Sequence, residues 1–132
     1  MTRDVFTVLG LDHINVTTPR ELESEVVEWY EAALGLDPIP KPQGTRPAGA
    51  WFRAGEHEVH VSIDHHQTTG TAHFGIVVDD FDAAVSRLQE CGSEIVAAGA
   101  IPGRRRIYTR DPAHNRIEIV AFDKSHARAS ER

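Results

Sequence analysis

The alternation of apolar and polar residues predicts a βαβββ order in the first half of the chain. Residues 9–17 read as a strand, and apolar residues recur at helical spacing over residues 21–34. Residues 36–39, 50–55 and 58–64 read as three further strands. The proline- and glycine-rich residues 40–49 between them predict a loop, which is a possible lid beside a site.

The second half repeats this order. Residues 72–78 predict a strand, residues 81–91 a helix, and residues 94–98, 105–109 and 116–122 three more strands. Gly35 and Gly92 follow the two predicted helices at an offset of 92 − 35 = 57 residues. We therefore expect an α+β fold: two βαβββ modules in one domain, with mixed sheets forming a cup-shaped cavity and helices on the outer faces. The modules span about residues 8–64 and 70–122, and residues 123–132 read as a flexible tail.

Composition narrows the classes of protein. A chain of 132 residues suggests one compact domain. The net charge of −6 argues against nucleic acid or an anionic membrane as partner. No apolar run reaches the ~20 residues that span a bilayer, and the N-terminal residues lack a signal-peptide pattern, so we expect a cytoplasmic protein. The single cysteine, Cys91, excludes an internal disulfide in this sequence.

Four potential metal ligands occupy matching places in the two halves. His13 and His73 are 73 − 13 = 60 residues apart, and His60 and Glu118 are 118 − 60 = 58 apart. Each lies on the strand face opposite the clearest apolar stripe, as His60 does opposite Val59 and Val61. Taken singly, each would be a solvent-exposed strand residue. Their shared parity and position favour one metal centre at the junction of the modules.

The predicted ligand set restricts the chemistry. Three imidazoles and one carboxylate suit a divalent Zn, Ni, Co, Mn or Fe ion, with positions left open for water or substrate. His60 has two possible roles: it is a fourth ligand, or it stands off the metal as a general acid or base. His60 and Glu118 are therefore the candidate catalytic residues.

Candidate substrate-binding residues lie on or next to predicted strands, close in sequence to the candidate ligands. Arg104 and Arg106 share parity and would hold a carboxylate or phosphate through bidentate contacts. The alternative is that they form a solvated basic edge. Trp51, Phe52 and Tyr108 either line the cavity or fill the core.

Five stretches together resemble the vicinal-oxygen-chelate superfamily, the glyoxalase/bleomycin-resistance/dioxygenase group. They are LDHINVTT, WYEAALGL, AWFRAGEHEVHV, AHFGIVVDDFDAAVSRLQECG and PGRRRIYTRDPAHNRIEIV, within residues 9–122. The resemblance implies paired modules around a divalent metal held by His13, His60, His73 and Glu118. It also implies chelation of two neighbouring substrate oxygens, and a homodimer.

Two positions depart from the family pattern. His60 stands where typical glyoxalase I has a glutamate, which weakens an assignment to that enzyme. His114 replaces the usual glycine of the turn in DPAHN, where a left-handed residue is expected and histidine is tolerated.

Three functions are compatible with these residues. The leading one is a metal-dependent lyase, isomerase or dioxygenase that acts on a small oxygenated molecule. A drug-binding protein of the bleomycin-resistance type is an alternative, against which the retained His13, His73 and Glu118 count. A thiol transferase of the fosfomycin type fits the ligands, but the sequence has no convincing potassium or phosphonate loop.

Overall fold

The first module is a four-stranded sheet with one helix. The computed structural model describes residues 5–65 and 70–124. The first sheet has the strand order β1-β4-β3-β2, and a single 3-10 turn, η1 (Arg20–Leu22), leads into α1 (Glu23–Ala32). Its strands are β1 (His13–Thr18), β2 (Asp37–Ile39), β3 (Ala50–Ala54) and β4 (His57–Ile63).

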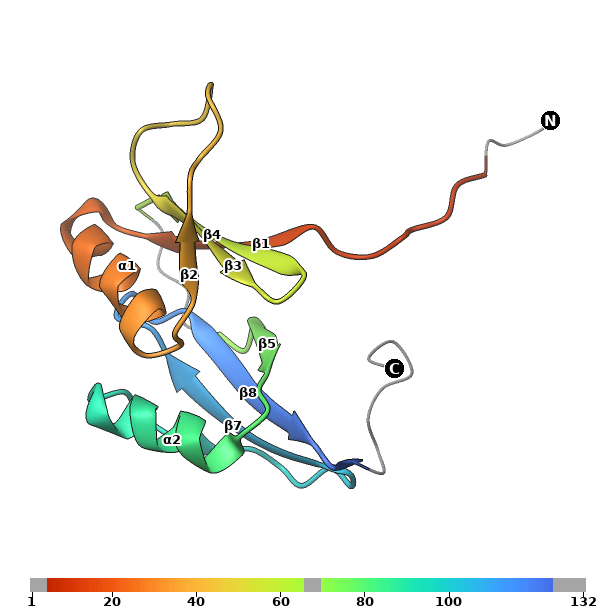
Figure 1. The fold of residues 1–132 in the computed structure, drawn as a ribbon. Coiled ribbons are helices and arrows are strands. Elements are labelled where there is room, and N and C mark those ends of the chain that lie inside the picture. The colour runs from red at the N-terminus through yellow and green to blue at the C-terminus, as the bar shows by residue number, and fades with distance from the viewer. Residues whose placement is uncertain (1–4, 66–69, 125–132) are drawn as a thin grey trace.

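The second module repeats this architecture (Figure 1). Its sheet has the order β5-β8-β7-β6, and its helix is α2 (Phe81–Glu90). Its strands are β5 (His73–Val77), β6 (Val96–Ala97), β7 (Arg104–Arg110) and β8 (Arg116–Phe122). In each module the first and last strands pair in parallel and the other pairs are antiparallel. The predicted fold class, two βαβββ modules with mixed sheets, is confirmed.

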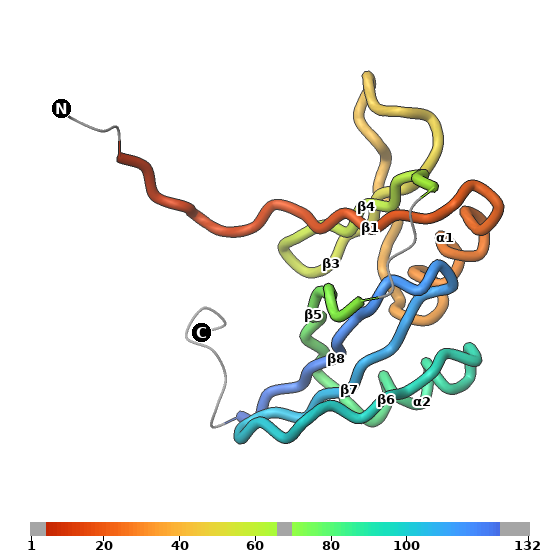
Figure 2. Tube along the Cα trace, turned by 180° about the vertical axis from the view of Figure 1, so that it is seen from behind, coloured from red at the N-terminus to blue at the C-terminus, as the bar shows by residue number. Residues whose placement is uncertain are grey.

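The first strand is shorter than predicted. β1 begins at His13, whereas the apolar pattern places its start at residue 9. β1 is an edge strand, and its partner β4 begins at His57, directly after the turn at Gly55 and Glu56. Since His13 already pairs with Glu58, the second residue of β4, residues 5–11 have no strand beside them. Residues 5–12 therefore extend away from the sheet, as Figure 2 shows from behind.

Residues with special conformations end the elements as the sequence suggests. Gly35 and Gly92 have φ values of 65° and 74°, which are costly for any residue with a Cβ. The Asp80 side chain caps α2 by accepting a hydrogen bond of 3.0 Å from the backbone N–H of Ala83. His114 has φ 68° in the turn between β7 and β8, which confirms the predicted left-handed residue.

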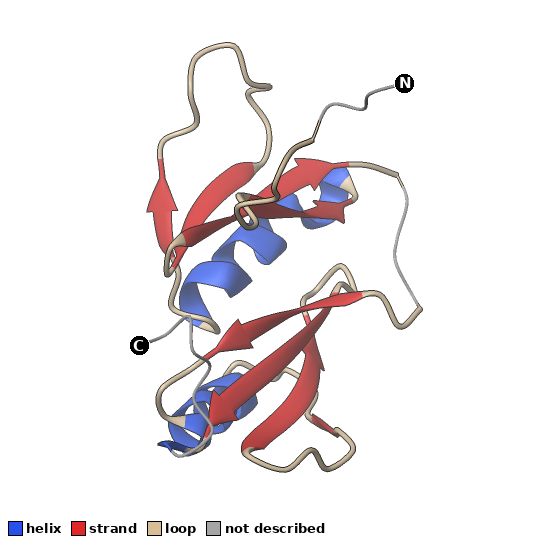
Figure 3. Ribbon diagram, turned by 90° about the vertical axis from the view of Figure 1, so that its right-hand side faces the viewer, coloured by secondary structure: helices blue, strands red, loops and turns tan. Residues whose placement is uncertain are grey.

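The two modules share one hydrophobic core. Tyr30 of α1 and Phe52 of β3 are fully buried, with ring centroids 5.9 Å apart. On its other side, α1 contacts the second module: Trp29 Nε1 donates to Ser93 Oγ (2.7 Å) and the Tyr30 hydroxyl donates to Asp111 Oδ2 (2.7 Å). Helix α1 thus covers its own sheet and joins it to the second module (Figure 3).

The helices are not membrane spans. None of those in the described ranges is long and apolar enough to cross a bilayer.

Candidate functional site

Two of the predicted ligands stack against each other in the first sheet. His13 and His60 lie on the neighbouring strands β1 and β4, with ring centroids 4.1 Å apart and 15° between the planes. Trp51 is the cross-strand partner of His60 on β3 and covers its other face at 3.8 Å. The His60 ring is therefore held between two aromatic rings, and its side chain is 9% exposed.

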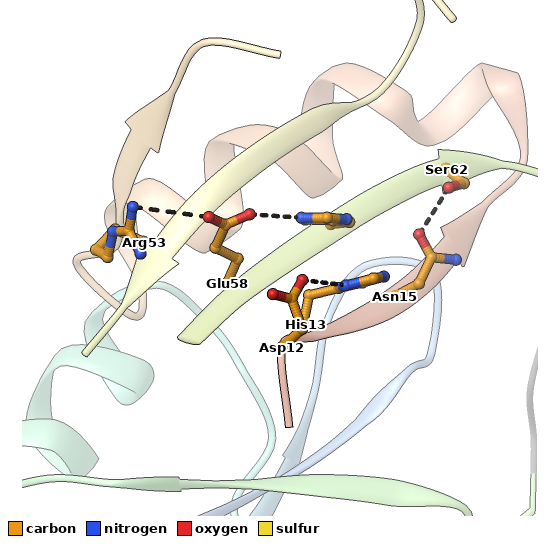
Figure 4. A network of polar contacts seen from close by, with 7 residues as sticks. Asp12, His13, Asn15, Arg53, Glu58 and Ser62 are labelled. Atoms are coloured by element: carbon orange, nitrogen blue, oxygen red, sulfur yellow. Dashed lines mark hydrogen bonds and ion pairs between the residues drawn. The ribbon is translucent and has the colours of Figure 1, made fainter. Parts of the chain in front are cut away.

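Carboxylates hold one nitrogen of each of these histidines (Figure 4). Asp12 Oδ2 is 2.9 Å from His13 Nδ1, and Glu58 Oε1 is 2.9 Å from His60 Nε2. A carboxylate only accepts hydrogen bonds, so those nitrogens carry the protons. In the neutral imidazoles the lone pair is then on Nε2 of His13 but on Nδ1 of His60. Arg53 Nη2 lies 3.6 Å from the other Glu58 oxygen and balances its charge.

The other two predicted ligands meet in the second sheet. His73 on β5 and Glu118 on the adjacent β8 approach to 3.2 Å between Nε2 and Oε1. His73 Nδ1 lies 2.8 Å from the backbone carbonyl of Thr71, which can only accept, so Nδ1 carries the proton. A neutral His73 therefore turns the lone pair of Nε2 toward a carboxylate oxygen. Two acceptors that face each other in this way need a cation, either a second proton or a metal ion.

The four predicted ligands form two pairs rather than one cluster. In residues 5–65 and 70–124, no group of three His, Cys, Asp or Glu side chains is close enough to hold a metal ion. His13 and His60 belong to the first sheet, and His73 and Glu118 belong to the second.

His60 is less able than His13 and His73 to donate a nitrogen lone pair to a metal ion. His13 and His73 each have Nδ1 bonded to an acceptor and Nε2 available, and their side chains are 43% and 32% exposed. His60 is covered on both ring faces and has Nε2 committed to Glu58. By donor type His13, His73 and Glu118 suit a divalent metal, but within the described ranges the fold does not bring these three side chains together. His60 is poorly placed to bind a metal through Nε2.

The predicted substrate-binding residues do not share one location. Trp51 packs on His60, and Tyr108 meets the His73 ring edge-on at 5.2 Å. Arg106 Nη1 lies 3.0 Å from the Tyr108 hydroxyl and 3.5 Å from Glu118 Oε1. Arg104 lies over the Phe122 ring at the start of β7. Phe52 is 0% exposed, so it fills the core and does not line a cavity.

Two residues that the sequence reasoning did not select contact the site. Glu58 orients His60, and the Arg116 guanidinium lies 3.6 Å from the centre of the Tyr108 ring. Each stands two residues from a predicted ligand on the same strand, Glu58 before His60 and Arg116 before Glu118. Strand parity places such neighbours on one face, so this signal was present in the sequence.

The chain matches a known protein family over most of its length. A sequence model of the Glyoxalase/Bleomycin resistance protein/Dioxygenase superfamily matches residues 10–119. No curated protein matches the chain.

Solved structures share the fold. A glyoxalase family protein from Bacillus anthracis is 30% identical and has a TM-score of 0.80, over 92% of this chain and 100% of its own. A lactoylglutathione lyase from Agrobacterium tumefaciens is 18% identical, with a TM-score of 0.67 over 86% of this chain and 94% of its own. A mutant of the fosfomycin resistance protein FosX from Listeria monocytogenes, complexed with Mn(II) and 1S,2S-dihydroxypropylphosphonic acid, is 14% identical. Its TM-score is 0.76 over 90% of this chain and 96% of its own.

Proposed function

The chain belongs to the glyoxalase/bleomycin resistance protein/dioxygenase superfamily, and we propose that it is a divalent-metal-dependent enzyme acting on a small oxygenated substrate. The observation that carries this proposal is the contact of His73 with Glu118. His73 Nδ1 is bonded to the Thr71 carbonyl, so in a neutral His73 the Nε2 lone pair faces the Glu118 carboxylate across 3.2 Å. That arrangement presents one neutral and one anionic donor to a cation.

We propose His13, His73 and Glu118 as the metal ligands. In both histidines an acceptor holds the Nδ1 proton, which fixes the ring and makes Nε2 a better donor. Two imidazoles and a carboxylate suit Zn, Ni, Co, Mn or Fe. When bound, the metal would supply a Lewis acid that stabilises negative charge developing on a substrate oxygen.

His60 is proposed as the general acid and base. Glu58 holds the Nε2 proton, so Nδ1 is the nitrogen that takes a proton from the substrate and returns it. The Glu58 carboxylate would stabilise the imidazolium formed after proton uptake, and the rings of Trp51 and His13 exclude water from both of its faces. A base beside an electrophilic centre supports lyase, isomerase or dioxygenase chemistry. The expected cytoplasmic location remains a prediction.

We further propose that a second copy of the chain completes the site. The two ligand pairs belong to different sheets. Helix α1 joins the modules on the side of the first sheet that carries Val59 and Val61, opposite His60. The extended segment of residues 5–12 supports a homodimer, because its five large apolar side chains are 72–97% exposed. They are Val5, Phe6, Val8, Leu9 and Leu11. Burial against a partner would stabilise each by about 1.5–3 kcal/mol.

Metal analysis tests the proposed function. Protein without a histidine tag is stripped with a chelator, reloaded with each candidate metal, and measured by inductively coupled plasma mass spectrometry. We expect about one equivalent per chain, and at least a tenfold loss of affinity for His73→Ala because one ligand is removed. His57→Ala is the matched control, since His57 is an exposed histidine at the start of the same strand as His60.

The proposal fails if the reloaded wild-type protein retains less than about a tenth of an equivalent. It also fails if His57→Ala loses as much metal as His73→Ala, since binding would then be adventitious histidine binding.

A further inference from the structure

One face of the second sheet is rich in arginine. Arg104, Arg106 and Arg110 alternate along β7 on the face that also carries Arg116 and Glu118 of β8. Two of these guanidinium groups have carboxylate partners: Arg106 is 3.5 Å from Glu118, and Arg110 is 3.5 Å from Glu94. Within the described part of the chain, Arg104 and Arg116 have no carboxylate partner. The face is therefore more positive than its own acidic residues can neutralise.

Tyr108 brings two of these cations together. Arg106 Nη1 donates to the Tyr108 hydroxyl (3.0 Å) and Arg106 Nε donates to the Gly99 carbonyl (3.0 Å). The Arg116 guanidinium lies over the face of the same ring at 3.6 Å. The Glu118 carboxylate can balance only one of these two positive charges, so the pair keeps a net positive charge that an added anion would balance.

Arg116 retains hydrogen-bonding capacity. Within the described ranges, its one hydrogen bond runs from Nη1 to the Thr71 carbonyl at 3.4 Å, which is longer than an ordinary N–H···O bond. Most of its N–H donors thus have no protein acceptor in the described ranges. A planar guanidinium with open donors is the group best matched to a carboxylate or phosphate.

The arginine pair adjoins the proposed metal ligands. Tyr108 is the register partner of Glu118 and touches the His73 ring. Arg104 does not belong to this group, because its guanidinium stacks on the Phe122 ring at the start of β7. Arg106 lies 3.5 Å from Glu118, and Arg116 stands two residues before Glu118 on β8. An anion held by Arg106 and Arg116 would therefore lie beside Glu118.

We infer that Arg106, Arg116 and the Tyr108 hydroxyl form an oxyanion-binding subsite. Its ligand is the carboxylate or phosphate group of a small acid whose neighbouring oxygens are the ones that react. The position of the subsite beside the reacting oxygens rests on the proposed function. The binding of an anion does not, since it requires no metal.

Titration of metal-free protein with inorganic phosphate tests the subsite. The readout is ¹H–¹⁵N NMR of the arginine side chains, in chelator and at constant ionic strength. We expect saturable shifts of the Arg106 and Arg116 Nε–H signals in the millimolar range, and at least a tenfold weaker affinity for Arg116→Gln. Arg116→Lys keeps the charge but not the planar fork of donors, so we expect its phosphate affinity to lie between those of the wild type and Arg116→Gln.

Arg105→Gln is the matched control. Arg105 lies on the same strand but points to the opposite face, where it pairs with Asp82 at 3.0 Å and covers Phe81. Arg105→Gln removes one positive charge without touching the subsite. We therefore expect it to leave phosphate affinity unchanged.

Two outcomes would overturn the inference. One is the lack of saturable shifts in the wild-type protein. The other is an equal loss of affinity in Arg105→Gln and Arg116→Gln, which would indicate a general charge effect. Because the chelator removes metal throughout, phosphate binding that persists after a failed metal reconstitution still supports the subsite.

Discussion

The identity of the protonated nitrogen separates the roles of the three candidate histidines. His13 and His73 hold their proton on Nδ1, against Asp12 and the Thr71 carbonyl. His60 holds its proton on Nε2, against Glu58. A neutral imidazole binds a metal or accepts a proton only through its other nitrogen. The acceptor atom beside each ring therefore decides which nitrogen is free, and so whether the histidine is proposed as a metal ligand or as the acid–base residue.

Removal of Glu58 tests the role of His60. A hydrogen bond of about 1.5 kcal/mol biases the two tautomers by roughly tenfold. In Glu58→Ala we expect His60 to change from predominantly Nε2–H to a mixture of tautomers. The ¹⁵N chemical shifts of the His60 ring report this change directly. Glu56→Ala, in the neighbouring turn, should leave the ring signals unchanged, and a persistent Nε2–H tautomer in Glu58→Ala would contradict the assignment.

At the scale of elements, the turn between β7 and β8 organises contacts with the first module. Asp111 Oδ1 accepts from the backbone N–H groups of Ala113 (2.8 Å) and Asn115 (3.0 Å). Asp111 Oδ2 accepts from the Tyr30 hydroxyl of α1, and Asn115 Nδ2 donates to the carbonyl of Thr17 in β1. One buried aspartate therefore joins the turn, the helix and, through Asn115, the first strand.

This junction makes stability depend on pH. Burial raises the pKa of Asp111 above its ordinary 3.8, although hydrogen bonds from Tyr30, Asn115 and Ala113 oppose the shift. Between 3.8 and the raised value, the folded chain binds more protons at Asp111 than the unfolded chain does. The contribution of Asp111 to the unfolding free energy therefore falls as pH rises through this window, by at most about 1.4 kcal/mol per pH unit.

Denaturant unfolding at several pH values measures the effect. We expect Asp111→Asn to lack this component, so that the difference in unfolding free energy between wild type and variant changes across the window above pH 3.8. The control is Asp82→Asn, whose carboxylate is 80% exposed. A constant difference between wild type and Asp111→Asn would show that burial does not shift Asp111.

At the scale of the whole molecule, the packing of the two modules separates the ligand pairs. Helix α1 inserts Trp29 and Tyr30 between its sheet and the second module, so the modules meet through the helix-bearing side of the first sheet. His13 and His60 lie on the opposite side of that sheet. Under the proposed ligand set, a second copy would supply the pair that is missing from each site, and the exposed apolar residues 5–11 would help to bind it.

Mixing two inactive variants tests this arrangement. His13→Ala and His73→Ala chains each lose one ligand from a different module. If sites form between subunits, refolding an equal mixture restores about a quarter of the wild-type metal, since half of the dimers are mixed and each has one intact site. Metal content after chelator wash is the measurement. No recovery above that of the separate variants would place the ligands within one chain.

Much of the fold was predictable because strand and helix periodicity are local properties of the backbone. The spacing of Val26, Trp29 and Tyr30 predicted α1, the alternation around His60 predicted β4, and both helix-ending glycines stand where expected. Residues 9–12 were wrongly included in a strand, because pairing depends on a neighbour that only the tertiary structure supplies.

The candidate site divides in the same way. The repeat offsets and strand parity selected His13, His60, His73 and Glu118, and the DPAHN turn predicted a left-handed His114, because these follow from strand direction and backbone sterics. The tertiary structure decided that the ligands form two pairs and that Arg116 and Arg106 both contact the Tyr108 ring system. Those facts arise from contacts between distant strands and from the docking of α1 on both modules. Periodicity within one strand cannot specify such contacts.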